Sequence, residues 1–172
     1  MAAFTVISHQ ELTGNASSVT FGSISGSYDH LCIKISARSD DVQYYDHLGI
    51  QFNGDTGTNY SDTYIYCGTA APGSSRSTTY NHISHLYGVT AASNLADTFG
   101  TMTVWVPHYA NSTNFKQVAA RCGSPSASTT QTLLLAAGLW ESTDAIDEVE
   151  LTTYSGNFVQ YSTFTLYGVT GA

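Results

Sequence analysis

The feature that most constrains the fold of this chain is a two-residue alternation of apolar and polar side chains along its whole length. Between residues 30 and 38, Leu31, Ile33 and Ile35 alternate with Lys34 and Ser36. Successive side chains of a β-strand point to opposite faces, so this pattern predicts strands with one face in a core. The same alternation is found at residues 47–52, 101–106, 147–154 and 163–169.

Further strands are predicted where β-branched and aromatic residues cluster, at residues 4–8, 18–24, 63–68, 115–122 and 132–141. Segments rich in Gly, Asn, Ser and Pro separate the strands and predict turns, among them 53–57, 71–75, 124–128 and 155–157. A short helix is expected only within residues 82–99. About ten strands at this spacing predict an all-β, jelly-roll-like sandwich of two antiparallel sheets, forming one domain over residues 1–172.

The charge balance excludes several classes of partner. The chain has 13 acidic and 5 basic residues, and charged residues make up only 10% of it. The basic residues are scattered along the sequence, so no basic stripe is available for direct nucleic-acid binding. No apolar run approaches the about 20 residues of a membrane span, and the first residues do not resemble a secretory signal. A surface with few charges instead favours packing against protein neighbours.

The cysteines and histidines do not predict a metal site. Cys32, Cys67 and Cys122 all fall within predicted strands, which indicates buried free thiols in a protein made in a reducing cytoplasm. The cysteine spacings do not fit a zinc site. His82 and His85 are three residues apart, but no third ligand is near them in sequence. The other histidines each stand alone in the sequence, at His9, His30, His47 and His108.

Acidic residues offer two further candidates. Asp40 and Asp41 share a loop, and a calcium ion there is left open, although no known loop spacing supports it. A pair of carboxylates could serve a glycosidase, but Asp147, Glu148 and Glu150 alternate along a predicted strand and are better explained as its solvated face. We therefore assign no catalytic, cofactor-binding or metal-ligating residue and expect a protein that is not an enzyme.

Aromatic residues give the best indication of binding. Trp105 and Tyr109 lie near the end of a predicted strand, and Tyr44, Tyr45 and Tyr60 lie near loops. Exposed rings there could stack on sugars or fill a pocket of a partner, whereas the alternative is packing between the two sheets. Trp105 and Tyr109 are the candidate contacts for a partner or glycan.

Three segments in order, FNGDTGTNYS, VPHYANSTNFK and SGNFVQYSTFTLYGV, resemble a pattern found in β-sandwich virion structural proteins of tailed bacteriophages. The matching residues are Phe52, Asn53, Gly54, Asp55 and Tyr60 in the first segment, Tyr109 and Lys116 in the second, and Gly156, Asn157, Phe158, Phe164, Tyr167 and Gly168 in the third. His108 departs from the pattern, because a smaller polar residue is expected before the tyrosine.

The physical chemistry of these motifs is that of fold determinants. Asn53 and the glycine after it favour a tight turn, and Asp55 is expected to bind nearby backbone N–H groups. Asn157 and the glycine before it predict a second turn. Tyr167 precedes Gly168, a position where a neighbouring backbone can approach closely.

The resemblance implies a virion component, and most closely a capsid decoration (cement) protein. Such a protein would bind the outer surface of the shell formed by the major capsid protein and stabilise it. It would associate with itself as a homotrimer or homodimer, with strands in residues 1–29 available for partner contacts. The alternative is the tip of a tail fibre, a receptor-binding domain that recognises host surface glycans. No cofactor is expected in either case.

Overall fold

The computed structural model describes residues 3–68, 71–126 and 132–171. In these ranges the chain is all-β and forms twelve strands. They are β1 (Ala3–Glu11), β2 (Ser18–Phe21), β3 (His30–Ala37), β4 (Tyr45–Phe52), β5 (Tyr60–Cys67), β6 (Pro72–Tyr80), β7 (Ile83–Thr90), β8 (Gly100–Pro107), β9 (Lys116–Ser124), β10 (Thr132–Trp140), β11 (Val149–Thr153) and β12 (Thr163–Thr170). None of the described residues forms a helix that could cross a membrane.

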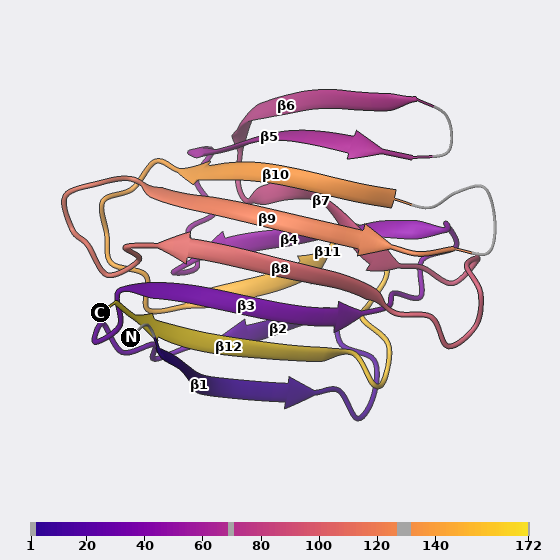
Figure 1. Ribbon diagram of the computed structural model, residues 1–172, viewed down its shortest axis with the longest axis horizontal. Coiled ribbons are helices and arrows are strands. Elements are labelled where there is room, and N and C mark those ends of the chain that lie inside the picture. The colour runs from indigo at the N-terminus through magenta and orange to yellow at the C-terminus, as the bar shows by residue number, and fades with distance from the viewer. Residues whose placement is uncertain (1–2, 69–70, 127–131, 172) are drawn as a thin grey trace.

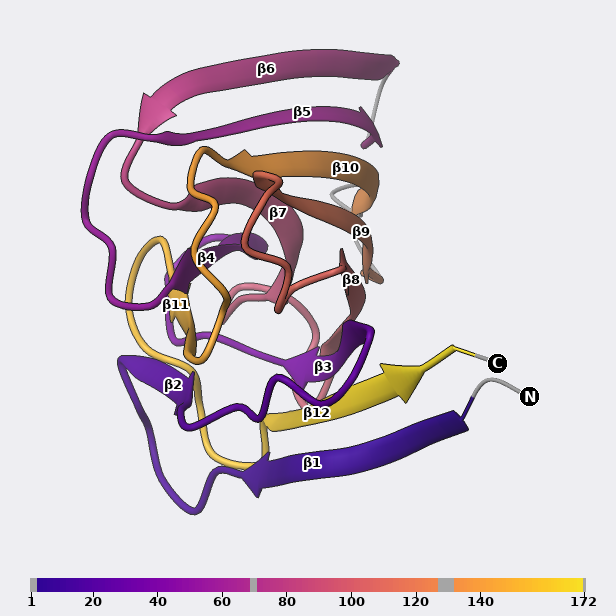
Figure 2. The same cartoon turned by 90° about the vertical axis from the view of Figure 1, so that its left-hand side faces the viewer.

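The strands form two antiparallel sheets that pack face to face, which confirms the predicted fold class. The large sheet has eight strands in the order β1-β12-β3-β8-β9-β10-β5-β6, and the small sheet has four in the order β2-β11-β4-β7. Figure 1 looks onto the large sheet, with the small sheet behind it and the two ends of the chain close together. Figure 2 shows the same two layers from the side.

A single hydrophobic core fills the space between the sheets. The large sheet contributes alternate residues such as Ile33 and Val104, and the small sheet contributes residues such as Leu48, Ile50 and Leu151, all with 0% exposure. At about 25 cal/mol per Å² of apolar surface, this burial is the dominant favourable contribution to folding. The alternation read from the sequence therefore corresponds to the inner faces of both sheets.

All ten predicted strands are present, and two strands were missed. The helix expected within residues 82–99 is wrong, because Ile83–Thr90 forms β7. The turn expected at residues 71–75 is also wrong, because Pro72–Tyr80 forms β6. Neither strand shows a clear alternation. Most side chains of β6 are small and polar, and the strand is mostly exposed on both faces, whereas β7 is buried over most of its length. In the turn predicted at 124–128, Ser124 is still the last residue of β9, and residues 127 and 128 lie outside the described residues.

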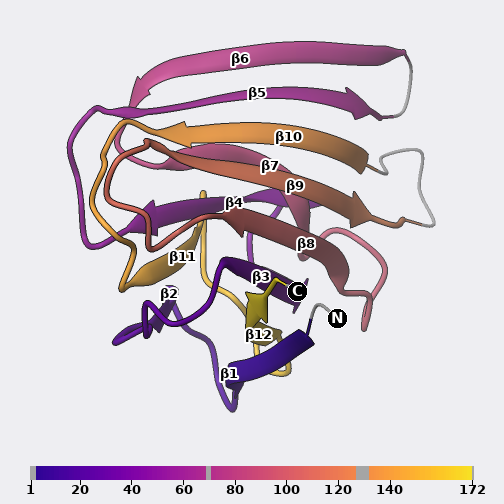
Figure 3. The same cartoon turned by 60° about the vertical axis from the view of Figure 1, so that its left-hand side comes forward.

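The large sheet is wider than the small sheet. Because β7 is the last strand of the small sheet, the β5–β6 pair extends past it, as Figures 2 and 3 show. The inner face of this pair is therefore only partly covered, although β5 still contacts β7. This overhang places side chains of β5 beside the exposed side of the small sheet.

Candidate functional site

The face of the large sheet that points away from the small sheet, called the outer face below, carries an unusual number of apolar side chains. The strand registers place Tyr167, Cys32, Trp105, Ala119 and Ala137 in one continuous row across it. The next rows carry large exposed side chains on β10 and β5: Leu133 is 63% exposed, Leu135 55% and Ile65 57%. Exposed apolar side chains grouped in this way mark interaction surfaces.

The same face carries every exposed basic side chain of the protein. Lys34, Arg76 and Arg121 are exposed and lie in these rows, and none forms a hydrogen bond or ion pair with a described residue. The other two basic residues are used internally, because Arg38 and Lys116 donate to backbone carbonyl oxygens. The outer face is thus positively charged on a protein whose formal net charge is −8.

The acidic residues lie almost entirely elsewhere. Of the 13 acidic residues, only Glu11 is in a row of the outer face, at the edge strand β1. The sequence suggested scattered basic residues, since Lys34, Arg76 and Arg121 are tens of residues apart. Only the strand order brings them onto one surface. The alternation did show that Lys34 points away from the core, but it could not show which side chains would be its neighbours.

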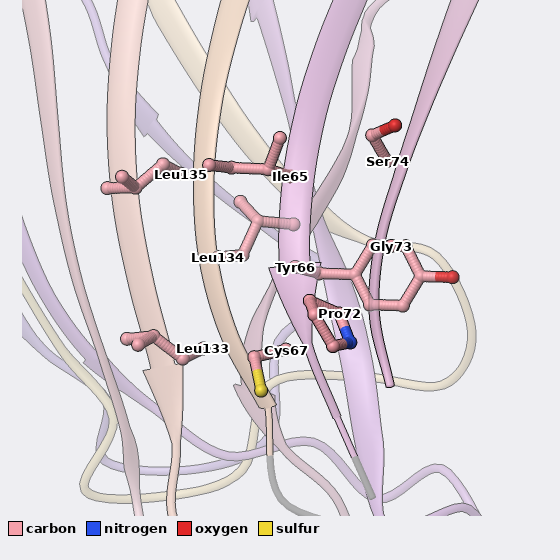
Figure 4. A pocket seen from close by; sticks show the side chains of 9 residues that line it. All are labelled: Ile65, Tyr66, Cys67, Pro72, Gly73, Ser74, Leu133, Leu134 and Leu135. Carbon is pink, nitrogen blue, oxygen red and sulfur yellow. The ribbon is translucent and has the colours of Figure 1, made fainter. Parts of the chain in front are cut away.

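An apolar pocket of about 460 Å³ lies on the outer face where β10, β5 and β6 run side by side. Figure 4 shows Ile65, Leu133 and Leu135 around it, with Cys67 and Pro72 at one end. Its volume falls within the roughly 300–1,000 Å³ of small-ligand or anchor-residue pockets. Because Arg121 pairs in register with Leu135, a cation borders this apolar surface.

The predicted contact residues Trp105 and Tyr109 lie in different environments. Trp105 is partly exposed on the outer face, where its ring lies 6.3 Å from that of Phe4 and 5.2 Å from that of His30. Tyr109 is fully buried, so the prediction that it contacts a partner or glycan is wrong. Its hydroxyl donates to Ser25 O and tethers the segment before β3.

The first motif forms a closed structural unit. Asn53 and Gly54 have positive φ angles of 53° and 63°, as the predicted turn requires. Asp55 accepts hydrogen bonds from the backbone N–H of Gly57 and from Nε1 of Trp140, at 2.8 and 2.7 Å. A hydrogen bond from Asn59 Nδ2 at 2.9 Å, together with these two, holds the pKa of Asp55 below its ordinary value.

Two aromatic side chains anchor this unit in the core. The hydroxyl of Tyr60 accepts the N–H of Phe52 at 3.1 Å, and both residues are buried. The ring of Tyr60 also stacks on Trp140, with centroids 6.1 Å apart. The motif therefore fixes a strand end, as expected, although Oδ1 of Asn59 is buried without a hydrogen-bond partner among the described residues.

The second and third motifs have the same character. Lys116 is 1% exposed, and its Nζ donates to Asn114 O and Thr143 O at 3.0 Å each. Gly156 has a φ of +72°, and the N–H of Asn157 donates to Asp40 Oδ1 at 2.6 Å. Phe158 and Phe164 are fully buried and make an edge-to-face contact at 4.9 Å. At Gly168, the group that approaches closely is the ring of Tyr28 and not a backbone segment, as the sequence had suggested.

One cysteine differs from the prediction. Cys32 and Cys122 are buried free thiols, as expected, whereas Cys67 is exposed. Cys67 lies on the outer face beside Leu133, its partner in register. The prediction for Cys67 is wrong because its side chain points to the outer face, which the small sheet does not cover.

A group of eight aromatic rings lies on the opposite side of the molecule, over β4, β7 and the overhanging β5–β6 pair. This tyrosine–histidine cluster consists of Tyr45, His47, Tyr64, Tyr66, Tyr80, His85, Tyr87 and Tyr154, which are joined by a continuous series of ring contacts. His30, His47 and His108, which are isolated in the sequence, make ring contacts in the structure. His47 contacts Tyr87 at 4.1 Å, and His108 contacts His30 at 4.8 Å.

His85 of this cluster lies close to a carboxylate and two hydroxyl groups, but the arrangement is not that of a catalytic triad. His85 Nδ1 lies 3.2 Å from the buried carboxylate of Asp62, and the hydroxyls of Ser84 and Ser77 lie 2.8 and 3.3 Å from the same nitrogen. In a Ser-His-Asp relay the hydroxyl and the carboxylate use opposite ring nitrogens. Asp62 also accepts the backbone N–H groups of Ser84 and His85, so its role is to tie β5 to β7.

The acidic loop residues are used structurally. Asp40 accepts hydrogen bonds from the backbone and side chain of Asn157 and from Asn15 Nδ2, which hold its pKa below the ordinary value. Glu150 lies in β11, whereas Asp147 and Glu148 precede it, so the predicted three-residue alternation along one strand is wrong. Within the described ranges, no group of three or more His, Cys, Asp or Glu side chains is placed to hold a metal ion.

Comparisons with known proteins do not assign a family. No protein-family model matches the chain, and no curated protein matches it. Among solved structures, the chain is similar to the galectin LEC-6 of Caenorhabditis elegans, with a TM-score of 0.38 and 6% sequence identity over 95% of this chain and 96% of that chain. A likeness this distant indicates neither a family nor a function.

Proposed function

We propose that the protein is a bacteriophage virion structural protein that acts by binding, and that it decorates the capsid by attaching to the outer surface of the major capsid protein shell. One observation carries the proposal: the outer face combines large exposed apolar side chains with all exposed cations of an acidic protein. Such a face fits a partner surface that is apolar and acidic, since apolar contact gives affinity and opposite charge gives orientation. The motif resemblance supplies the identity of that partner, the capsid shell.

Several features favour binding over catalysis. The motif residues are engaged in turns and in the core, and the Asp62–His85 pair is arranged as a structural tie. A decoration protein needs no chemistry, because many copies on a symmetric shell add the contributions of modest contacts. We therefore propose a non-enzymatic protein located at the capsid surface.

Self-association into a homotrimer or homodimer is part of this proposal. Three cations on each outer face would repel one another if two outer faces met. Contacts between copies therefore use the sheet edges. Residues 1–29 supply β1 at one edge of the large sheet and β2 at one edge of the small sheet, which supports their use in partner contacts.

The test is to add the purified protein to shells assembled without it. We expect co-sedimentation with the shells and greater resistance of the shells to heat. The charge reversal Arg121→Glu should weaken binding about tenfold, because it turns one attraction of the outer face into a repulsion. Glu150→Lys, a matched reversal on the small sheet, should leave binding unchanged. Absence of binding, or unchanged shell stability, would contradict the proposal.

A second candidate is the receptor-binding domain of a tail fibre that recognises host surface glycans. The tyrosine–histidine cluster favours it, because exposed aromatic side chains commonly line sugar-binding surfaces. The two candidates differ in where the chain lies in an intact virion. Density for this fold on the shell lattice supports decoration, and density at the end of the tail supports receptor binding.

A further inference from the structure

A second pocket lies at one end of the tyrosine–histidine cluster. It has a volume of about 420 Å³ and is lined by residues from the loop before β4, the first part of β4 and the loop after β11. Those that matter here are Asp41, Gln43, Tyr44, Tyr45, His47 and Tyr154. It lies beside β4 and β11 of the small sheet, on the side of the molecule opposite the outer face. Its volume is in the range of small-ligand sites.

Aromatic side chains of this pocket are held in place yet remain accessible. Tyr154 is 75% exposed, and its ring stacks on that of His47 at a centroid distance of 5.1 Å and an interplanar angle of 27°. Tyr44 is 41% exposed. The ring of Tyr154 is therefore backed on one face by His47, and a rigid, exposed ring of this kind binds an apolar ligand face at low entropic cost.

Polar groups at the pocket wall have hydrogen-bonding capacity to spare. The side chains of Asp41 and Gln43 make no hydrogen bond with a described residue. His47 Nδ1 is buried without a hydrogen-bond partner in the described part of the chain. Because the buried Nδ1 of His47 is not accessible, the groups open to a ligand are the carboxylate of Asp41 and the amide of Gln43, which lie next to an aromatic ring. Such a mixed lining orients a ligand bearing several hydroxyl groups.

The charges of the pocket argue against an anionic ligand. No lysine or arginine lines it, and two carboxylates, Asp41 and Asp46, do. Burial, reinforced by the nearby His85, lowers the pKa of His47 to about 4, so this ring is neutral at pH 7. A phosphate or a carboxylate-bearing ligand would therefore meet only negative charge.

The arrangement of rings also argues against a cationic ligand. A cation-binding cage needs an empty space enclosed by aromatic faces. Here the rings of Tyr45, Tyr87 and Tyr154 surround His47, at centroid distances of 6.3, 4.1 and 5.1 Å, so the enclosed position is already filled. The exposed ring of Tyr154 and the free polar groups of Asp41 and Gln43 fit a ligand that is hydroxylated and apolar on one face.

We propose that this pocket binds a neutral pyranose sugar, with the C–H face of the ring stacked on Tyr154 and the hydroxyl groups bonded to Asp41 and Gln43. This is a binding activity separate from attachment to the shell. The two surfaces lie on opposite sides of the sandwich, so a copy attached through its outer face can still present the sugar pocket to the surroundings. Failure of either proposal leaves the other unaffected.

The test is saturation-transfer NMR with the full chain and a panel of neutral methyl pyranosides: the glucoside, galactoside, mannoside and N-acetylglucosaminide. We expect transfer to the ring C–H protons of at least one of them. Tyr154→Ala should weaken that binding about fivefold or more, because the stacking surface is lost, whereas Tyr154→Phe should retain it. Because Tyr154 is exposed, its replacement is expected to leave the fold intact.

Tyr161→Ala is the matched control, since Tyr161 is another exposed tyrosine and does not line the pocket. Choline and sialic acid serve as cationic and anionic probes, for which no transfer is expected. The proposal is overturned if no neutral sugar shows transfer, if binding is equally strong in Tyr154→Ala, or if only a charged probe binds.

Discussion

At the scale of single residues, the polar side chains with the most demanding surroundings are engaged within the protein itself. Lys116 is buried and donates to two carbonyl oxygens, and Asp55 binds the indole nitrogen of Trp140. Such groups are costly to bury unless hydrogen-bonded, which is why their partners are fixed by the fold. Asp46 is different, because one of its carboxylate oxygens is buried without a hydrogen-bond partner among the described residues.

Asp46 should make stability depend on pH. Burial, partly offset by the N–H of His47, raises its pKa from 3.8 to about 6. A raised carboxyl pKa means that the ionised form is disfavoured in the folded state, so the associated stability is present below pH 4 and lost as the pH rises through 6. We expect Asp46→Asn to be more stable than the natural protein at pH 7.5 by about 1–3 kcal/mol, and the difference to vanish near pH 4.

Urea denaturation at these two pH values measures this effect. Asp41→Asn is the control. The carboxylate of Asp41 is more exposed than that of Asp46, so its replacement should give no comparable gain in stability at pH 7.5. Equal stability of Asp46→Asn and the natural protein at pH 7.5 would show that the Asp46 carboxylate is adequately solvated.

At the scale of elements, the approach of β7 to β8 determines how closely the sheets can meet. Gly100 opens β8 and faces Gly88 in β7, and a Cβ atom on Gly100 would overlap the carbonyl oxygen of Gly88. The atoms that this Cβ would meet all belong to the backbone of β7, so a rotamer change of a neighbouring side chain cannot make room for it. The pair of glycines therefore sets the distance between the two strands.

Gly100→Ala should destabilise the fold by about 2–4 kcal/mol through this overlap. Gly14→Ala is the matched control, because no atom lies within 4 Å of the Cβ position at Gly14. Its effect should stay within about 0.5 kcal/mol. Thermal denaturation of both variants checks the prediction, and a Gly100→Ala protein as stable as the Gly14→Ala protein would contradict it.

At the scale of the whole molecule, the sandwich separates two kinds of surface. The outer face of the large sheet is apolar and cationic, whereas the opposite side carries tyrosines, histidines and acidic loops. A protein with two different faces can bind one partner on each, which suits a component that is fixed to a shell and exposed to the surroundings.

Cys67 provides a probe of the outer face. Burial raises the pKa of Cys32 and of Cys122, the latter to about 12, so both thiols should react slowly with alkylating reagents. We expect the folded protein to react rapidly at Cys67 alone, as mass spectrometry of the labelled peptides would show.

Attachment to shells should slow alkylation of Cys67 about fivefold or more, because this thiol lies on the face proposed to be covered. Labelling at the same rate in shell-bound and free protein would place the contact away from this end of the outer face. The thiols of unfolded protein should all react, which controls for reagent quality.

The strands with one buried face and the tight turns between them could be predicted from local patterns in the sequence. Alternation is a property of each strand alone, so the core residues Ile33 and Leu151 could be placed from local pattern. The turn at Asn53 and Gly54 was predictable for the same reason, since its left-handed angles depend on two adjacent residues. Strands β6 and β7 were not predicted, because the burial of their residues depends on which other parts of the chain cover them.

Which strands are neighbours could not be predicted from local sequence, and both candidate surfaces depend on that strand order. Lys34, Arg76 and Arg121 share a face because β3, β9 and β6 belong to one sheet, and Tyr154 meets His47 because β11 pairs with β4. Backbone hydrogen bonds are chemically the same in every strand, so local sequence specifies that a strand forms far more strongly than which partner it takes. The burial of Tyr109 has the same origin, since its hydroxyl meets a carbonyl more than eighty residues away in sequence.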